Sequence, residues 1–102
     1  MYSLSYLPKA LEDYEKSVVW YSEQSISAAE NFIVAVQQKI EGIKTNPTHF
    51  KNKYKNYYET SLKKFPFDII YIIEQKLILI VGIYHQKRSP KGKYRRAKLW
   101  ML

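Results

Sequence analysis

The sequence contains no cysteine, only three glycines and no long uninterrupted apolar run. Without cysteine the chain forms neither a disulfide nor a thiolate metal site, and a reducing compartment is the simpler expectation. The three glycines are scattered and make no glycine-rich phosphate loop. The longest apolar region, residues 69–84, is interrupted at residues 74–76 by Glu-Gln-Lys, so neither piece is long enough to span a bilayer. We therefore expect no membrane partner.

Metal ligands and export signals are also scarce. The two histidines, His49 and His85, are far apart, and no His-x-x-His or Glu-x-x-His spacing occurs. The sequence therefore predicts no metal and no other cofactor. The first residues, Met-Tyr-Ser-Leu-Ser-Tyr, lack the basic start and apolar stretch of a signal peptide, so we expect a cytoplasmic protein. At 102 residues, the chain has room for a single domain, residues 1–102, with one core.

What the chain has in abundance is apolar residues, 46% of the total, and positive charge, with a net charge of +8. The apolar content favours a folded protein over a disordered one. Residues 1–50 carry four lysines and six acidic residues, whereas residues 51–102 carry thirteen Lys or Arg and three acidic residues. Seven of those cations lie between Lys87 and Lys98. This asymmetry indicates an anionic partner, either nucleic acid or an acidic protein surface; the alternative is a solvated surface that aids solubility.

The N-terminal half has the pattern of one strand followed by two helices. Alternation predicts a strand at residues 2–6, and Pro8 is typical of the first position of a helix. An apolar stripe predicts that this helix runs to about Gln24. Ser27 and Glu30 have the spacing of a capping box that starts a second helix, which ends near Asn46-Pro47. The expected helical hairpin would pack on a sheet through one apolar face, made by Leu11, Val18, Phe32, Val36 and Ile40.

The C-terminal half has the pattern of a sheet. Residues 48–56 are predicted to be a polar connection, and residues 57–65 a strand. Residues 67–74 and 77–85 are β-branched apolar runs on either side of Gln75-Lys76, the pattern of a tight hairpin. The predicted fold class is α+β in the order β-α-α-β-β-β, with the helical hairpin packed on a small twisted, mainly antiparallel sheet. Tyr14, Tyr21 and Tyr71 are assigned to the core. A basic C-terminal tail follows at about residues 86–102 and ends in apolar Leu-Trp-Met-Leu.

Two segments carry a resemblance to a known family. Residues 62–71, Leu-Lys-Lys-Phe-Pro-Phe-Asp-Ile-Ile-Tyr, resemble the strand-turn-strand signature of RelE/ParE toxins. Residues 81–90, Val-Gly-Ile-Tyr-His-Gln-Lys-Arg-Ser-Pro, resemble the last strand of the ParE-like branch, with its His, Arg and Pro. The early Ala-Leu-Glu-Asp-Tyr helix is consistent with both. The resemblance covers roughly residues 3–90.

This resemblance implies the toxin of a type II toxin–antitoxin pair, neutralised by an antitoxin whose acidic, partly disordered segment wraps the toxin surface. ParE-like toxins poison DNA gyrase, whereas RelE-like toxins cut mRNA in the ribosomal A site. The motifs favour the ParE-like branch. Two alternatives stay open: a RelE-like mRNA endonuclease, and an antitoxin- or nucleic-acid-binding homologue without toxicity. A homodimer and a toxin–antitoxin hetero-oligomer are both compatible with the resemblance.

The candidate site combines the two matched segments. Target-binding residues are predicted to be Lys63, Lys64, Lys87 and Arg88, because the ends of neighbouring strands would bring their charges together. If the chain is a metal-free nuclease, the catalytic residues would be His85, Arg88, Lys64 and Tyr94. The cations would stabilise the phosphate, and His85 or Tyr94 would transfer protons. Each residue also has an ordinary explanation, since lysines are commonly solvated and a histidine can simply end a strand.

Overall fold

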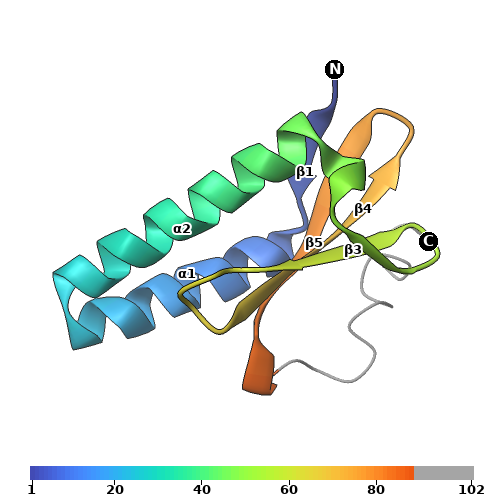
Figure 1. The fold of residues 1–102 in the computed structure, drawn as a ribbon. Helices are drawn as coiled ribbons and strands as arrows, with labels where there is room; N and C mark the ends of the chain where they lie inside the picture. The colour runs from blue at the N-terminus through green and yellow to red at the C-terminus, as the bar shows by residue number, and fades with distance from the viewer. Residues whose placement is uncertain (89–102) are drawn as a thin grey trace.

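The computed structural model describes residues 1–88, which form two layers (Figure 1). Two antiparallel helices lie on one face of a five-stranded sheet whose strand order is β1-β5-β4-β3-β2. All neighbouring strands are antiparallel except β1 and β5, which are parallel. The predicted α+β class is confirmed. The elements are β1 (Ser3–Tyr6), α1 (Pro8–Gln24), α2 (Ile26–Thr45), a 3-10 turn (Pro47–His49), β2 (Lys51–Tyr54), β3 (Tyr57–Ser61), β4 (Phe67–Glu74), β5 (Leu77–His85) and a second 3-10 turn (Gln86–Arg88).

The sheet has one strand more than the sequence predicts. The supposed polar connection contains β2, an edge strand with the sequence Lys-Asn-Lys-Tyr whose side chains are all exposed. Such a strand shows no apolar alternation, because it buries neither face. Pairing with β3 holds it in place, and the Asn52 side-chain amide donates to the backbone oxygens of Lys55 and Tyr57 at 2.7 and 3.0 Å. The order is therefore β-α-α-β-β-β-β.

The start of α2 also differs from the prediction. The helix begins at Ile26, and its N-cap is Ser25, whose hydroxyl oxygen accepts a hydrogen bond from the Ala28 backbone N–H at 2.9 Å. The capping box assigned to Ser27 is therefore wrong. The extended backbone of Ser25, with φ −170° and ψ 151°, turns the chain sharply from α1 into α2. The predicted bounds of α1, β4 and β5 are confirmed.

The core lies between the helices and the sheet. The α2 residues that are buried repeat at helical spacing: Ala29, Phe32, Val36, Ile40 and Ile43. In α1 the buried residue is Ala10, while Tyr14, Val18 and Tyr21 are partly buried against the core. Leu11 is 41% exposed, so its predicted place in the core is wrong. The sheet lies on the side of Ala10, and a small side chain there lets the helix approach β5 closely.

The two faces of the sheet follow from alternation along β4. Phe67 contacts the ring of Phe32 at a centroid distance of 5.0 Å, and the Tyr71 hydroxyl donates to the Pro47 carbonyl at 2.6 Å. Phe67 and Tyr71 therefore point towards the helices, on what we call the inner face. Ile70 and Ile72 alternate with them and point to the opposite, outer face. Tyr71 is fully buried, which confirms its assignment to the core.

Candidate functional site

The two matched segments meet at one end of the sheet. The Leu62 N–H donates to the Phe67 carbonyl at 3.0 Å, which closes the loop between β3 and β4. Phe67 is paired with His85, and the Gln86 N–H donates to the Pro66 carbonyl at 2.8 Å. The β3–β4 loop is therefore tied directly to the end of β5. This arrangement brings together the segments that carry five residues, which we call the basic rim: Lys63, Lys64, His85, Lys87 and Arg88.

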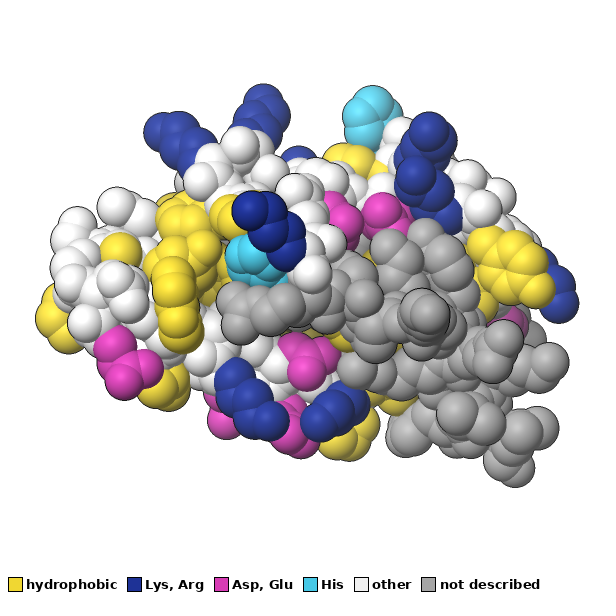
Figure 2. Space-filling view, turned by 90° about the horizontal axis from the view of Figure 1, so that it is seen from below, with side chains coloured by type: hydrophobic (Ala, Val, Ile, Leu, Met, Phe, Trp, Pro, Cys, Tyr) yellow, Lys and Arg dark blue, Asp and Glu magenta, His cyan; other side chains and the backbone are white. Residues whose placement is uncertain are grey.

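The lysines of the basic rim are exposed. Lys63 and Lys64 lie in the loop before Phe65, and Lys87 lies in the 3-10 turn after β5. Within residues 1–88, neither Lys63 nor Lys64 makes an ion pair. Their charges are thus not offset by a neighbouring carboxylate and are available to an anionic partner. Figure 2 shows that basic side chains project at several separate places on one face of the molecule, with acidic side chains between them.

His85 is held by its neighbours at the end of β5. Its ring is half-buried and meets the ring of Phe67 edge to face, at a centroid distance of 5.2 Å. Its Nδ1 accepts a hydrogen bond from the Lys87 backbone N–H at 3.1 Å. A neutral imidazole that accepts at Nδ1 carries its proton on Nε2, so Nδ1 must lose this bond before it can take a second proton. Nδ1 of His85 is therefore occupied by a backbone hydrogen bond.

Of the predicted catalytic residues, the structure describes Arg88 only in its backbone and does not describe Tyr94. The backbone of Arg88 ends the second 3-10 turn, at the basic rim, but its side chain lies outside the described part of the structure. Tyr94, the second predicted proton-transfer group beside His85, also lies outside the described residues. The geometry of the site therefore rests on His85 and the lysines.

A pocket of about 610 Å³ lies beside the basic rim, between α2 and the β3–β4 loop. We call it the basic pocket. Its lining includes the apolar side chains of Ala35, Phe50, Leu62 and Phe65, and three lysines, Lys39, Lys63 and Lys64. Among residues 1–88, no Asp or Glu lines it. It thus combines an apolar floor with positive charge alone.

The sequence did not identify Lys39 and Phe50 as site residues. The Lys39 ammonium lies 5.5 Å from the centre of the Phe50 ring, close enough for a cation–π contact. Lys39 lies on α2, whereas Phe50 follows the 3-10 turn beyond it. Their proximity depends on how the chain folds back after α2, which no local pattern shows.

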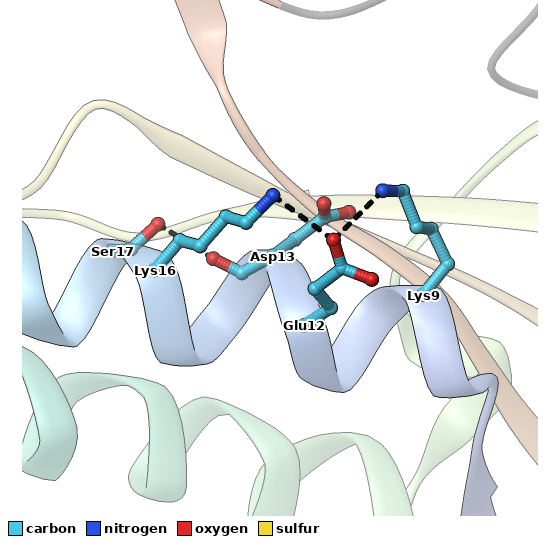
Figure 3. Close-up of polar contacts among 5 residues, drawn as sticks. All are labelled: Lys9, Glu12, Asp13, Lys16 and Ser17. Carbon is cyan, nitrogen blue, oxygen red and sulfur yellow. Dashed lines mark hydrogen bonds and ion pairs between the residues drawn. The ribbon is translucent and has the colours of Figure 1, made fainter.

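A second pocket of about 210 Å³ is lined by His85 and by residues of α1. Its lining includes Asp13, Lys16 and Trp20, and the Trp20 side chain is 49% exposed. Figure 3 shows Lys16 turned to Glu12, with Nζ 2.9 Å from Oε1, and Lys9 on the same oxygen at 3.0 Å. Hydrogen bonds from Lys16 and Lys9 lower the pKa of the Glu12 carboxyl. Because Glu12 offsets Lys16, this pocket is less basic than the first.

The described residues show no metal centre and no membrane span. Across residues 1–88, no group of three or more His, Cys, Asp or Glu side chains is placed to hold a metal ion. No helix in that same range is both long and apolar enough to cross a bilayer.

A family model for the ParE toxin of the type II toxin–antitoxin system parDE matches residues 4–90, which include both segments of the basic rim. The chain belongs to the ParE toxin family. It is a type II toxin–antitoxin toxin of the RelE/ParE superfamily, and the resemblance found in its sequence is confirmed. No curated protein matches the sequence.

Solved structures share the fold of this ParE-family toxin. The chromosomal ParDE system from P. aeruginosa superposes with a TM-score of 0.63 at 22% identity, covering 83% of this chain and 96% of that one. A mutant of the E. coli toxin RelE in the free state superposes with a TM-score of 0.64 at 13% identity, covering 99% of this chain and 98% of that one. The YoeB–YefM complex from Staphylococcus aureus superposes with a TM-score of 0.56 at 19% identity, covering 83% of this chain and 98% of the matched chain. At these identities the likeness shows the fold alone.

Proposed function

We propose that this ParE-family toxin inhibits growth in the cytoplasm by binding DNA gyrase through the basic rim. The observation that carries the proposal is the hydrogen bond that the Lys87 N–H donates to Nδ1 of His85. A gyrase poison needs a binding surface, and exposed lysines at a fixed end of the sheet provide one. A nuclease would also need a proton acceptor, and Nδ1 of this histidine already accepts the Lys87 N–H. The match of the ParE family model through residue 90 supports the same choice.

Induced expression with two readouts tests the proposal. We expect DNA cleavage complexes and intact mRNA. The double variant Lys63→Glu/Lys64→Glu should suppress the cleavage complexes, because it reverses two exposed charges of the basic rim. Lys53→Glu is the matched control, since Lys53 is an exposed lysine on β2, away from the rim. Arg88→Lys should also weaken the effect if a planar guanidinium is needed for paired hydrogen bonds. Cleavage complexes that survive all rim substitutions in folded protein would contradict the proposal.

The second candidate function is a ribosome-dependent mRNA endonuclease. It is favoured by the similarity of fold to the E. coli toxin RelE, which covers almost the whole chain. His85→Ala separates the two functions. A nuclease should cut RNA as the parent protein and lose this activity in the variant while ribosome binding survives, whereas a gyrase poison should cut RNA neither as the parent nor as the variant. A chain that shows neither activity while binding an antitoxin would be the non-toxic homologue.

We further propose that an acidic, partly disordered antitoxin segment binds the basic pocket as an amphipathic helix. The apolar floor suits the apolar face of such a helix, and Lys39, Lys63 and Lys64 suit its carboxylates. The structures of similar fold include a ParDE toxin–antitoxin system and a YoeB–YefM toxin–antitoxin complex, which supports a partner of this kind.

Binding of the protein encoded by any small acidic reading frame beside this gene provides the test. Lys39→Glu should weaken binding, and the loss should shrink as salt screens the charges. Lys53→Glu should bind as the parent does. Equal affinity of both variants would place the antitoxin elsewhere on the toxin.

A further inference from the structure

Lys39, on the α2 side of the basic pocket, is half-buried and has no carboxylate partner in the described part of the chain. Its ammonium lies over the Phe50 ring, 5.5 Å from the ring centre. None of the ion pairs among residues 1–88 includes Lys39. A lysine partly withdrawn from water is normally paired with an anion. The position of Lys39 therefore indicates that an anionic ligand completes the pocket.

Two aromatic rings in the lining of the basic pocket are held in place by neighbouring rings. Phe50 meets His49 edge to face at a centroid distance of 5.2 Å, and Phe65 meets Tyr21 and Phe32 edge to face at 5.3 and 5.4 Å. Phe50 and Phe65 are both half-buried and both line the pocket. A ring that is fixed before binding loses little freedom when a ligand stacks on it. The floor is thus preformed for a planar aromatic group.

Gly42 leaves the pocket open above the Phe50 ring. It lines the pocket from α2, and a Cβ built on it would lie 3.8 Å from Cζ of Phe50, an ordinary van der Waals contact. Packing against Phe50 therefore does not require a glycine. Glycine within a helix is also less stable than alanine. The consequence of a glycine at this position is that the ring stays accessible from the pocket.

We propose that the basic pocket binds a nucleoside polyphosphate, with ATP as the representative ligand. Its volume of about 610 Å³ lies within the range of small-molecule sites. The base stacks on the Phe50 and Phe65 rings, and such stacking accepts any base. The phosphates are held by Lys39, Lys63 and Lys64, whose ammonium groups act as compact point charges.

The lining favours a polyphosphate over a single phosphate. Three lysines enter it from two separate segments, and among residues 1–88 no carboxylate lies between them. This concentration of positive charge matches a chain of phosphates. Asn31 and Gln38 also line the pocket from α2, and their side-chain amides can both donate and accept hydrogen bonds. They provide neutral partners for the edge of the base or for the sugar.

A bound nucleotide occupies the place proposed above for the antitoxin helix. Nucleotide and antitoxin should therefore exclude one another. The exclusion rests on the proposed antitoxin site, whereas nucleotide binding itself does not. Through this competition the nucleotide concentration would regulate how firmly the toxin is held by its antitoxin.

Calorimetric titration of the full chain tests the site, at an ionic strength of about 0.15 M so that loose charge attraction is screened. The ligands are ATP, adenosine and inorganic triphosphate. We expect ATP to bind more tightly than either of the others, because each of those engages only the rings or only the lysines. Triphosphate that binds as tightly as ATP, or ATP that does not bind, would overturn the proposal.

Three variants locate the ligand within the pocket. Gly42→Leu keeps every lysine and fills the space above Phe50, and it should weaken ATP binding at least tenfold. Phe50→Leu, which keeps an apolar side chain but removes the ring, should weaken it roughly tenfold. Lys39→Met should have an effect of similar size, because it removes one charge. Lys53→Glu, on β2 and outside the pocket lining, is the control and should bind as the parent does.

Folding of each variant is checked by its melting curve, and only folded variants are titrated. Unchanged ATP affinity in folded Gly42→Leu or folded Phe50→Leu would show that the base does not stack at this place and would contradict the proposal. A short single-stranded RNA provides a further comparison. If it binds through the same residues more tightly than ATP, the pocket is a site for a nucleic-acid strand and the proposal is wrong.

Competition with the antitoxin separates this inference from the proposed antitoxin site. If Lys39→Glu weakens antitoxin binding but ATP does not bind the toxin, the nucleotide site is wrong and the antitoxin site stands. If ATP binds as expected but does not displace the antitoxin, the nucleotide site stands and the antitoxin lies elsewhere. Displacement by ATP, and not by adenosine, would support both.

Discussion

The ring of Tyr84 lies against the backbone of Gly82, where any side chain would collide with it. A Cβ built on Gly82 would be 2.2 Å from Cε2 of that ring and 2.8 Å from its hydroxyl oxygen. Both residues lie on the outer face of β5, two positions apart. Gly82 is therefore required by the close approach of a neighbouring ring.

We expect Gly82→Ala to lower the free energy of unfolding by roughly 1–3 kcal/mol, because the added methyl group forces the ring out of place. The measurement is urea denaturation. Tyr84→Ala alone should also destabilise, but the double variant should be less affected than the sum of the two, since the collision no longer occurs. Additive losses would show that the ring does not limit position 82.

The aromatic cluster around Phe32 should dominate the core. Phe32 is fully buried, and its ring meets those of Tyr21, Phe65 and Phe67 at centroid distances of 4.9 to 5.4 Å. Phe32→Ala should therefore cost about 3–5 kcal/mol of stability. Val34→Ala, on the same helix and 49% exposed, is the control and should change little. An unchanged melting curve for Phe32→Ala would remove this residue from the core.

Alkaline pH should unfold the protein through Tyr71. Burial, with a smaller contribution from Tyr58, raises the pKa of the Tyr71 phenol above its usual value. The unfolded chain then ionises first, near pH 10, while the folded chain stays protonated. Stability is complete below that pH and is lost as the pH rises above it.

The Tyr71 hydroxyl also donates to the Pro47 carbonyl at 2.6 Å. Tyr71→Phe should therefore be less stable at neutral pH by about 1 kcal/mol. Its stability should fall less steeply above pH 10, as measured by denaturation at a series of pH values. The same alkaline slope in parent and variant would show that other tyrosines, such as Tyr6 and Tyr14, carry the effect; burial raises the pKa of both.

The stability of the junction between α1 and α2 should depend on the side chain of Ser25 and not on that of Ser27. Ser25→Ala removes the hydroxyl that caps the Ala28 N–H and should cost about 1 kcal/mol. Ser27→Ala is the matched control, because Ser27 lies in the first turn and is not the N-cap. Thermal unfolding of both variants checks this; a larger loss from Ser27→Ala would restore the capping box predicted from sequence.

Buried elements were the part of the fold that the sequence predicted well. The continuous β-branched runs predict β4 and β5 to the residue, because strands buried on both sides are apolar throughout. The edge strand β2 was missed, because it is fixed by pairing and not by burial. On α1, an apolar stripe alone does not distinguish Leu11 from Ala10. The distinction depends on which side the sheet lies, and a periodic pattern does not contain that information.

The candidate site was also predicted in part from the sequence. Strand order alone brings Lys63 and Lys64 to the end of the sheet near His85, so a sequence argument reached them. Lys39 and Phe50 belong to no motif, and they join the site only because the chain folds back after α2. The bond from Lys87 to His85 is likewise a matter of local backbone geometry, and it changes the chemistry expected of the histidine.

The parallel pairing of β1 with β5 has a consequence for biosynthesis. Ser3 is paired with Leu77, and Tyr6 with Ile80, so β1 cannot pair until β5 has been translated. Until that strand leaves the ribosome, the helical hairpin has no complete sheet to cover, and its apolar face stays exposed on the nascent chain. Three residues of the basic rim, His85, Lys87 and Arg88, lie at or just after the end of β5. A nascent chain released before residue 85 therefore lacks both the partner strand of β1 and the end of β5 that carries part of the basic rim.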